Sequence, residues 1–385
     1  MPDVVIVGGG IIGAASAYEL TRRGVSVTLF ERAELAAGAS GRNQGWFVLS
    51  SDEHLGPMSR ASVPVYEEIV DTSPVTVRFD REAVGHLLIA RDPAGIEMAR
   101  EHATQWAATG VHAERLDAAE LREAEPALAS SIIEAWLLDQ GRRIDPAALT
   151  VALALRAREQ GADLRTHVNV RALIESASRV TGVVTDDGLV AADVVVLAAG
   201  PWSAAFTRPL GLPLPVNGAR GWIVELSAEP GTIRHHIEEE DGTWDEEHAV
   251  PTAAHLASGF PREPAVSALL HQSHDDAIVC GASHHPALRA EPEDVGAPAR
   301  IVERAISVAP PLADLEVRGI RWGIRPMSPD GRPIVGWLAD GLLAATGHGP
   351  EGILLGGGTA ALVASLVTGD DPPFPAGAFD PKRFG

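Results

Sequence analysis

Apolar and β-branched residues open the chain in a pattern typical of a buried parallel strand. Residues 4–7 read Val-Val-Ile-Val, a consecutive run expected where both faces of a strand are covered. Residues 11–23 then place apolar positions at helical spacing until Gly24, which suits a helix C-terminus. Residues 25–30 form a second apolar run. This order predicts a right-handed crossover in an open α/β sheet, with ligand binding at the carboxyl edge of the strands.

The same alternation of elements returns further along the chain. Asp145 and Pro146 are typical of a helix N-terminus, and helical spacing continues from there to Gly161. Residues 163–170 and 180–185 then have the composition of strands. A second α/β unit is therefore expected here.

Two later segments extend the predicted sheet. Residues 193–199 form another buried strand pattern that ends at Gly200, and residues 342–345 repeat it near the C-terminus. Gly347 then begins a glycine-rich turn into an apolar helix over residues 353–367. The sheet is thus expected to be assembled from separate parts of the chain.

The pattern between these blocks differs, because polar and apolar positions alternate and prolines are frequent. A length of 385 residues also exceeds the roughly 250 to 300 residues that one core usually supports. We therefore predict two discontinuous domains. The nucleotide-binding domain is expected over residues 1–56, 141–205 and 321–385, and a substrate-binding domain over residues 57–140 and 206–320, which include the acidic, histidine-containing stretch 234–248.

Composition narrows the possible partners. Asp and Glu number 52 against 31 Lys and Arg, which gives a formal net charge of −21. Such a surface repels phosphate polymers and anionic lipid, so neither nucleic acid nor a membrane surface is expected as a partner. The acidity could also attract cationic amines, although a well-solvated surface is the simpler interpretation.

Metal binding and membrane insertion are not expected. Cys280 is the only cysteine, which excludes an internal disulfide, and it follows two apolar residues as a core position would. The pairs at 235–236 and 284–285 are adjacent histidines, whose side chains point to opposite faces of an extended segment, so they are poor chelates. We see no basic leader and no uninterrupted apolar run near the roughly 20 residues of a spanning helix. A cytoplasmic location without integral membrane association is the resulting prediction.

A glycine motif between the first strand and helix predicts a dinucleotide site. Gly8, Gly10 and Gly13 form G-x-G-x-x-G, and Glu31 ends the next strand eighteen positions after the last glycine. Glycine lets the backbone approach a pyrophosphate at a helix N-terminus, and the carboxylate accepts hydrogen bonds from a ribose. The motif alone does not distinguish NAD from FAD. An NAD-linked reductase would, however, leave the glycine-rich segments 38–45 and 346–353 without a purpose.

Five motifs in order give the chain a family resemblance. After the first motif come the loop Gly-Ala-Ser-Gly-Arg-Asn-Gln-Gly at 38–45, Ala-Ala-Gly-Pro-Trp-Ser at 198–203, Gly-Ile-Arg-Pro with Pro-Asp-Gly-Arg-Pro within 323–333, and the closing segment from Thr346 to Ile353. Together they resemble the amino-acid oxidase superfamily of flavoproteins, which includes D-amino-acid oxidase, glycine oxidase, sarcosine oxidase and D-amino-acid dehydrogenases. The resemblance extends from residue 4 to about residue 368.

The resemblance implies a discontinuous Rossmann-like α/β domain that binds FAD, joined to an α+β substrate domain on a mixed or antiparallel sheet. It implies that FAD is noncovalent, because residues 321–325 hold no cysteine and residues 38–45 no histidine. Val170 would contact the adenine through its backbone. The full set of implied cofactor residues is Gly8, Gly10, Ile12, Gly13, Glu31, Arg32, Ser40, Arg42, Asn43, Gln44, Gly45, Val170, Gly200, Trp202, Arg325, Gly347, His348, Gly349, Gly352 and Ile353.

Two residues are candidates for the catalytic site. Arg325 lies in the G-x-R-P motif whose arginine, in the similar oxidases, pairs with the substrate carboxylate; the alternative is a structural ion pair. His348 lies in the closing loop and could contact flavin or substrate, shuttle a proton at a near-neutral pKa, or only pack. Candidate pocket residues, each also compatible with a role in the core, are Gln44, Trp46, Arg220, Trp222 and His271.

One departure from the family concerns tyrosine. The chain has only Tyr18 and Tyr66, so the substrate-domain tyrosine that helps to hold the carboxylate in several relatives has no evident counterpart. Arg220 or His271 could substitute for it. The identity of the substrate therefore does not follow from the resemblance.

The reaction implied is oxidation of the C–N bond of a small amino acid or N-substituted amino acid. Hydride transfer to flavin would give an imine that hydrolyses, and oxygen would reoxidise the flavin to form hydrogen peroxide. A dehydrogenase of the same fold that passes electrons to a quinone or carrier protein stays open as an alternative. A flavin-binding protein without turnover is a third interpretation, against which Arg325 and the intact closing segment argue.

Overall fold

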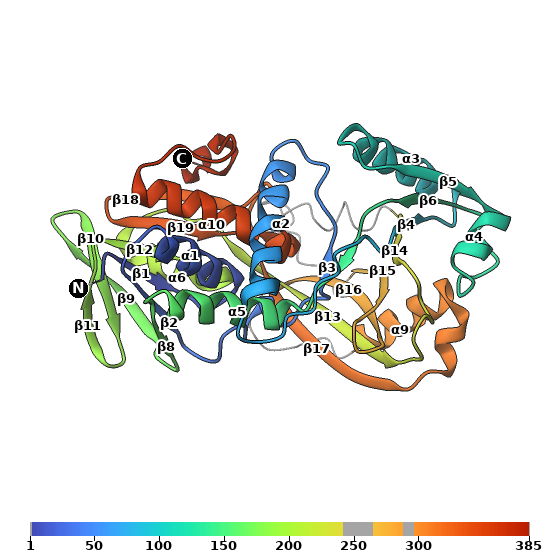
Figure 1. Cartoon of the computed structure of the whole chain (residues 1–385), viewed down its shortest axis with the longest axis horizontal. Coiled ribbons are helices and arrows are strands. Elements are labelled where there is room, and N and C mark those ends of the chain that lie inside the picture. Colours follow the sequence, from blue (N-terminus) through green and yellow to red (C-terminus); the bar gives the residue numbers. More distant parts are fainter. Residues whose placement is uncertain (1, 242–264, 288–295, 385) are drawn as a thin grey trace.

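The computed structural model describes residues 2–241, 265–287 and 296–384. Two sheets organise this part of the chain, as Figure 1 shows: a six-stranded sheet near both termini and an eight-stranded sheet on the opposite side. Helices and strands alternate in the first sheet, and the second sheet is largely antiparallel. This is the α/β plus α+β architecture that the sequence predicts.

The six-stranded sheet has the order β18-β19-β12-β1-β2-β8. All its neighbours are parallel except the antiparallel pair β18–β19, so β1 lies between parallel strands from distant parts of the sequence. The strands are β1 (Val4–Val7), β2 (Val27–Glu31), β8 (Asp163–Thr166), β12 (Val194–Leu197), β18 (Ile334–Ala339) and β19 (Leu342–Thr346).

Both faces of this sheet are covered, which explains the uninterrupted apolar run at its centre. Val4 and Ile6 pack into the core formed with the helices, whereas Val5 and Val7 pack on the opposite side. The helices are α1 (Ile11–Arg22), α2 (Leu55–Thr72), α5 (Pro146–Glu159) and α10 (Gly352–Thr368). The opposite side is covered by a three-stranded antiparallel sheet of β9 (Val170–Ser176), β10 (Arg179–Thr185) and β11 (Gly188–Ala191).

Helix α10 is more apolar than the sequence pattern suggested. The segment Gly349–Thr368 is long and apolar enough to cross a membrane by length and composition, so the expectation that no such run exists was too strict. However, 67% of its 18-residue apolar stretch is buried inside the protein. It packs between α1 and α2, where Tyr66 Oη donates to the Ile353 carbonyl oxygen at 2.6 Å. We therefore interpret α10 as a core helix.

The eight-stranded sheet has the order β17-β13-β16-β15-β14-β4-β6-β5, with β14 and β4 parallel. Its strands are β4 (His86–Ile89), β5 (Ala113–Asp117), β6 (Glu134–Leu138), β13 (Asn217–Ser227), β14 (His236–Glu239), β15 (Ala265–Gln272), β16 (Ala277–Ala287) and β17 (Val317–Met327). Its helices are α3 (Pro93–Ala108), α4 (Ala118–Ala124) and α9 (Ala297–Val308). Cys280 is buried in the core beneath α9, where burial raises the pKa of its thiol to about 12.

Two of the predicted domain boundaries do not coincide with element ends. The boundary between residues 320 and 321 falls inside β17. The boundary between residues 56 and 57 falls inside α2, which packs against α10 and α5 although most of it lies in the predicted substrate domain. We propose that the two sheets with their own helices define the domains, so that β17 belongs to the second domain and α2 to the first. The acidic stretch 234–248 is described only as far as residue 241; the rest lies outside the described residues.

Candidate active site

A cavity of about 1110 Å³ lies at the carboxyl ends of the six-stranded sheet. Its wall contains the last residues of β1 and β2, the residues that follow β12, and the end of β19. The opposite wall comes from β13, β14, β15 and β17 of the eight-stranded sheet. The cavity therefore joins the two sheets at the edge where open α/β folds bind their ligands.

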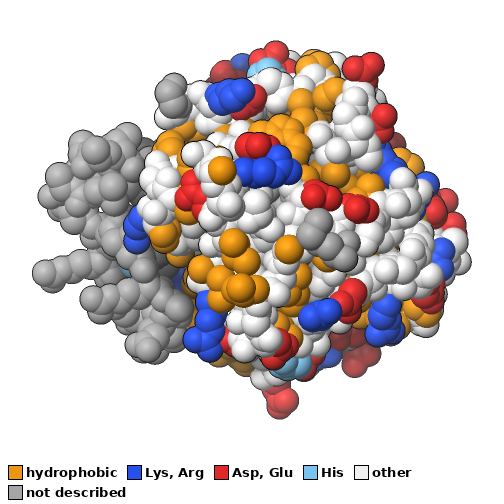
Figure 2. All heavy atoms as spheres, turned by 90° about the vertical axis from the view of Figure 1, so that its left-hand side faces the viewer, with side chains coloured by type: hydrophobic (Ala, Val, Ile, Leu, Met, Phe, Trp, Pro, Cys, Tyr) orange, Lys and Arg blue, Asp and Glu red, His pale blue; other side chains and the backbone are white. Residues whose placement is uncertain are grey.

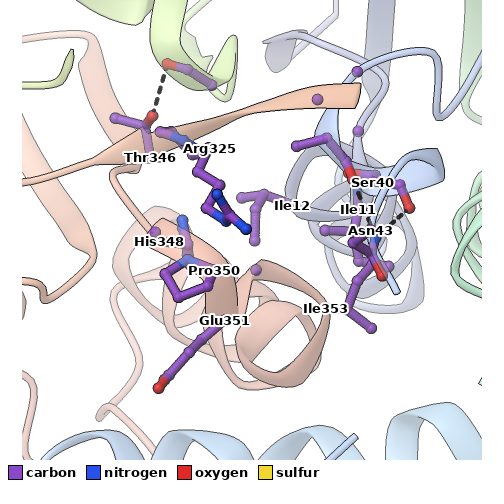
Figure 3. Close-up of a pocket in the computed structure, with 18 of the residues that line it drawn as sticks. Ile11, Ile12, Ser40, Asn43, Arg325, Thr346, His348, Pro350, Glu351 and Ile353 are labelled. Atoms are coloured by element: carbon purple, nitrogen blue, oxygen red, sulfur yellow. Dashed lines mark hydrogen bonds between the residues drawn. The ribbon is translucent and has the colours of Figure 1, made fainter. Parts of the chain in front are cut away.

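The first glycine motif presents the N-terminus of α1 to this cavity. A Cβ atom on Gly10 would meet only Ser40 Oγ, at 3.0 Å, so the Gly10 backbone is open to the cavity. Ser40 Oγ in turn accepts a hydrogen bond from Ile11 N at 2.9 Å (Figure 3). A Cβ on Gly13 would overlap the Gly8 carbonyl oxygen, so the third glycine permits close packing of helix and turn. This is the geometry that a pyrophosphate requires.

Glu31 and Arg32 lie at the next strand end. The Glu31 carboxylate accepts hydrogen bonds from Gly9 N at 2.7 Å and from Ala33 N at 2.9 Å, which fixes it beside the glycine turn. The Arg32 guanidinium carbon lies 4.1 Å from the ring centre of Trp202, within the range of a cation–π contact. The two distant motifs that contain these residues therefore meet at one end of the cavity.

The second glycine-rich loop is held by its own side chains. Asn43 Nδ2 donates to the carbonyl oxygens of Ala39 and Ser40 at 3.1 and 2.8 Å, and Asn43 Oδ1 accepts from Gly45 N at 2.9 Å. Arg42 Nε donates to the Ala37 carbonyl oxygen at 2.8 Å. These bonds shape a loop whose residues Ser40, Arg42 and Asn43 line the cavity.

The closing segment approaches the cavity from β19 and α10. Thr346 Oγ1 donates to the Gly200 carbonyl oxygen at 3.0 Å, which ties this segment to the end of β12 (Figure 3). His348 Nε2 lies 2.9 Å from Thr359 Oγ1, and its Nδ1 has no hydrogen-bond partner among the described residues. Burial lowers the pKa of His348 to about 3. The expectation of a near-neutral histidine is therefore wrong, since His348 stays uncharged at physiological pH.

Arg325 extends from β17 toward the closing segment. Figure 3 shows its guanidinium on the side of the cavity where His348 and Pro350 lie, with Ile12 beyond it. Its Nη1 donates to the Ser283 carbonyl oxygen at 3.0 Å. The guanidinium covers Gly221, where a Cβ atom would lie 2.7 Å from its central carbon. A side chain at position 221 would displace it, so glycine there makes room for the arginine.

Three of the predicted pocket residues do not line the cavity. On β13, Gly221 and Ile223 face it, so the alternation of a strand places Arg220 and Trp222 on the opposite face. The Arg220 guanidinium carbon lies 5.5 Å from the ring centre of Trp322, which itself belongs to the cavity wall. His271 is buried behind Trp46, with ring centres 6.1 Å apart. The proposed substitution of a family tyrosine by Arg220 or His271 therefore has no support in this geometry.

Most of the other predicted residues are brought together. The cavity wall contains Gly8, Gly10, Ile12, Glu31, Arg32, Ser40, Arg42, Asn43, Gln44, Trp46, Val170, Gly200, Trp202, Arg325, His348, Gly349, Gly352 and Ile353. Gly13, Gly45 and Gly347 lie beside it without lining it.

The cavity also contains acidic and aromatic residues that the sequence analysis missed. Glu351 lies in the short turn before α10, where burial, and then the charge of Asp52, raise the pKa of its carboxyl to about 7. Figure 3 shows this carboxyl pointing away from Arg325. Trp106 and Glu238 line the end of the cavity beyond Trp46. Trp106 and Glu238 belong to no motif at fixed spacing, so the sequence carried no signal for them. Glu351 lies within the closing segment, but the glycines and His348 of that segment carried the prediction.

These residues fit an adenine dinucleotide with a flavin. The N-termini of α1 and α10 both reach the same cavity, and neither is capped by the side chain of its own N-cap residue. Apart from Ile11 N, which donates to Ser40 Oγ, this leaves backbone N–H groups for an anionic ligand. Buried polar atoms without a hydrogen-bond partner in the described chain include Gln44 Oε1, Trp46 Nε1 and His348 Nδ1. Such atoms are costly unless a ligand or water satisfies them.

Fold and cavity together define a Rossmann-type dinucleotide-binding protein whose ligand extends toward a second domain. The family described as FAD dependent oxidoreductase matches residues 3–366. The chain therefore belongs to this family of FAD-dependent enzymes, and FAD is its cofactor.

Several proteins are similar over their full length. The chain is 27% identical to the uncharacterized oxidoreductase YurR of Bacillus subtilis, over 99% of both chains. It is 28% identical to a glycine oxidase of Geobacillus kaustophilus, covering 99% of this chain and 97% of that one. The crystal structure of glycine oxidase from that organism superposes with a TM-score of 0.86, at 27% identity and 98% coverage of both chains.

Proposed function

We propose that the chain oxidises the C–N bond of an amino acid or N-substituted amino acid. The position of Arg325 carries this proposal, because its guanidinium lies in the cavity next to the closing segment at the N-terminus of α10. A planar guanidinium binds a carboxylate through two parallel hydrogen bonds. The similar proteins named glycine oxidase support it, since their named substrate is an amino acid.

Each group of the chain has a limited task in this reaction. Arg325 holds the substrate carboxylate and so orients the carbon–hydrogen bond that breaks. Burial lowers the pKa of His348, so we assign it a hydrogen bond to the bound ligand and no proton transfer. FAD, held by the residues of the glycine motifs, would supply the acceptor for the hydride that leaves the substrate carbon, and oxygen would be the final electron acceptor and yield hydrogen peroxide. The amine lone pair forms the C=N bond, and the imine hydrolyses after release.

FAD is proposed to be bound noncovalently. The loop at 38–45 contains no histidine, and the buried thiol of Cys280 lies in the core under α9. Residues 321–325 of β17 contain no cysteine. No candidate for a flavin tether therefore appears at the positions that the resemblance singles out.

An anaerobic panel of amino acids, N-methyl amino acids and simple amines tests the proposal. We expect amino acids to bleach the flavin absorption and the matching decarboxylated amines to bleach it far more slowly. Oxygen uptake compared with dye reduction then separates an oxidase from a dehydrogenase that uses a quinone or carrier. If no compound with a C–N bond bleaches the flavin, the proposed function is wrong and a flavin-binding role without turnover is favoured.

A further inference from the structure

The cavity continues past Trp46 into a corner that the proposed reaction does not use. Trp46, Trp106 and Glu238 all line it, although they come from three separate elements. The Glu238 side chain is 20% exposed, whereas that of its neighbour His86 is 1% exposed. Because Glu238 also belongs to the cavity wall, its carboxylate is accessible from the cavity.

His86 holds the three cavity residues around one place. Its ring packs edge-on against Trp46 and Trp106, with ring centres 5.4 and 5.6 Å apart. Its Nε2 lies 2.9 Å from Glu238 Oε2. The indole of Trp106 is fixed in turn, since its Nε1 donates to the Leu49 carbonyl oxygen at 2.9 Å. Two indole rings and a carboxylate are the groups with which proteins bind organic cations.

The electrostatics of the corner favour a cation. Burial lowers the pKa of His271 to about 3 and that of His236 well below its usual value, so these two rings beside Trp46 add no positive charge to the corner. The arginines among the described cavity residues are Arg32, Arg42 and Arg325, which belong to the parts of the wall near the nucleotide and the closing segment.

The corner lined by Trp46, Trp106 and Glu238 lies far from Arg325 along the eight-stranded sheet. Arg325 lies on β17 and Glu238 on β14, and the order of the sheet places β13, β16 and β15 between them. Four spacings of about 4.8 Å give roughly 19 Å between the two strands, and both side chains shorten this by reaching into the cavity. One extended molecule, with its carboxylate at Arg325, would therefore reach the corner only through a long side chain.

We propose that Glu238, Trp46 and Trp106 form a cation subsite that selects amino acids with a positively charged side-chain end. The ligand class is an organic cation: an ammonium, a guanidinium or a methylated ammonium. This inference rests on the proposed amino-acid oxidation and narrows its substrate class. The carboxylate supplies charge, and the indole faces contact the methylene or methyl groups around the cation.

Turnover of length-matched substrates tests the subsite in the FAD-containing protein. Lysine, norleucine and 2-aminoadipate, each as both enantiomers, present a cation, a neutral end and an anion on similar side chains. We expect kcat/KM to favour lysine over norleucine by about tenfold or more, and Glu238→Gln to remove most of that preference, mainly through KM. Glu240→Gln is the matched control, because Glu240 pairs with His102 at 2.8 Å and does not line the cavity.

A binding measurement separates failure of the subsite from failure of the proposed reaction. 6-Aminohexanoate and hexanoate carry the carboxylate with or without the distal ammonium and have no α-amine to oxidise. Shifts in the flavin spectrum should report tighter binding of 6-aminohexanoate, by about tenfold, in the parent and in Glu240→Gln but not in Glu238→Gln. Equal binding of both ligands to the parent would overturn the subsite, whatever the turnover results. A preserved subsite without turnover of any amino acid would instead refute the reaction.

Discussion

Single residues of the cavity owe their chemistry to burial more than to residue type. The sequence placed His348 in the closing segment and suggested a group that titrates near neutrality, but its buried position keeps it uncharged. The pKa of Glu351, which lies three residues later in the same segment, is raised by burial, the cause that lowers the pKa of His348. Sequence spacing could identify where a motif lies, whereas the degree of burial depends on which distant elements cover it.

Arg325 should determine the preference for a carboxylate. Arg325→Ala is expected to lower kcat/KM for an amino acid between about tenfold and a thousandfold, since a bidentate pair contributes about 2 to 5 kcal/mol. Arg325→Lys should recover part of the loss because it keeps the charge without the planar fork. The control is the decarboxylated amine, which should respond much less. Equal losses for amine and amino acid would make Arg325 a structural residue.

Gly10 should be indispensable for the cofactor. A glutamate at this position would place a carboxylate at the N-terminus of α1, where the pyrophosphate is expected, and would repel it. We expect Gly10→Glu to purify without flavin absorption. Gly377→Glu is the control, because a side chain there meets no atom within 4 Å. A fully yellow Gly10→Glu protein would show that the pyrophosphate lies elsewhere.

The pH dependence of stability should report the buried Glu351. Its pKa of about 7 lies above the ordinary value of 4.5, so the folded chain retains a proton that the unfolded chain releases. The contribution of Glu351 to the free energy of unfolding is therefore fully present below about pH 4.5, and it is lost as the pH rises through about 7. Glu351→Gln should raise the free energy of unfolding of FAD-free protein by about 1 to 3 kcal/mol at pH 8 and change it little at pH 5. Urea titrations at both pH values measure this; an equal effect at both would contradict the assignment.

At the scale of elements, strong periodicity made the first sheet predictable. The strands and helices expected at 4–7, 11–23 and 353–367 agree with β1, α1 and α10 within one or two residues. The second sheet was harder to predict from the sequence. An alternating pattern predicts that a strand has two different faces, but it does not indicate which face lines the cavity. The pairing of β13 with β16 has a register shift between Arg220 and Val224. Arg220 and Trp222 were predicted to line the cavity, but they lie on the other face of β13.

The packing of α10 against α2 should control cofactor retention. A Cβ atom on Gly358 would overlap the Met58 carbonyl oxygen, so Gly358→Ala must push the two helices apart. We expect a loss of stability of about 1 to 3 kcal/mol and weaker FAD binding, because the N-terminus of α10 lines the cavity. Thermal unfolding and the fraction of bound flavin measure both effects. Gly377→Ala should match the parent; unchanged flavin content in Gly358→Ala would separate this packing from the site.

At the scale of the whole molecule, the acidic composition coexists with a mixed surface. Figure 2 shows acidic and basic side chains interspersed on the face near the six-stranded sheet, with small groups of hydrophobic side chains between them. The net charge of −21 is thus not gathered into one patch on this face. Such a surface suits a well-solvated enzyme whose specificity lies inside its cavity.

The whole protein should release its flavin on denaturation. Acid precipitation is expected to leave a colourless pellet and FAD in the supernatant, because the contacts proposed to hold the cofactor are all noncovalent. Absorption and mass spectra of both fractions provide the measurement. Flavin that stays with the precipitated chain, or a chain mass increased by that of FAD, would refute the noncovalent assignment.

The strand order of the six-stranded sheet also affects how the chain is made. β1 is synthesised before the other strands of its sheet, yet β12 on its flank follows almost 190 residues later, and α10, which packs on α1, follows later still. Contacts of such long sequence separation form slowly and only after the intervening chain exists. The glycine turn is therefore synthesised long before it has a complete binding site, and the nascent chain must keep the apolar strand β1 from other partners until α10 has been made.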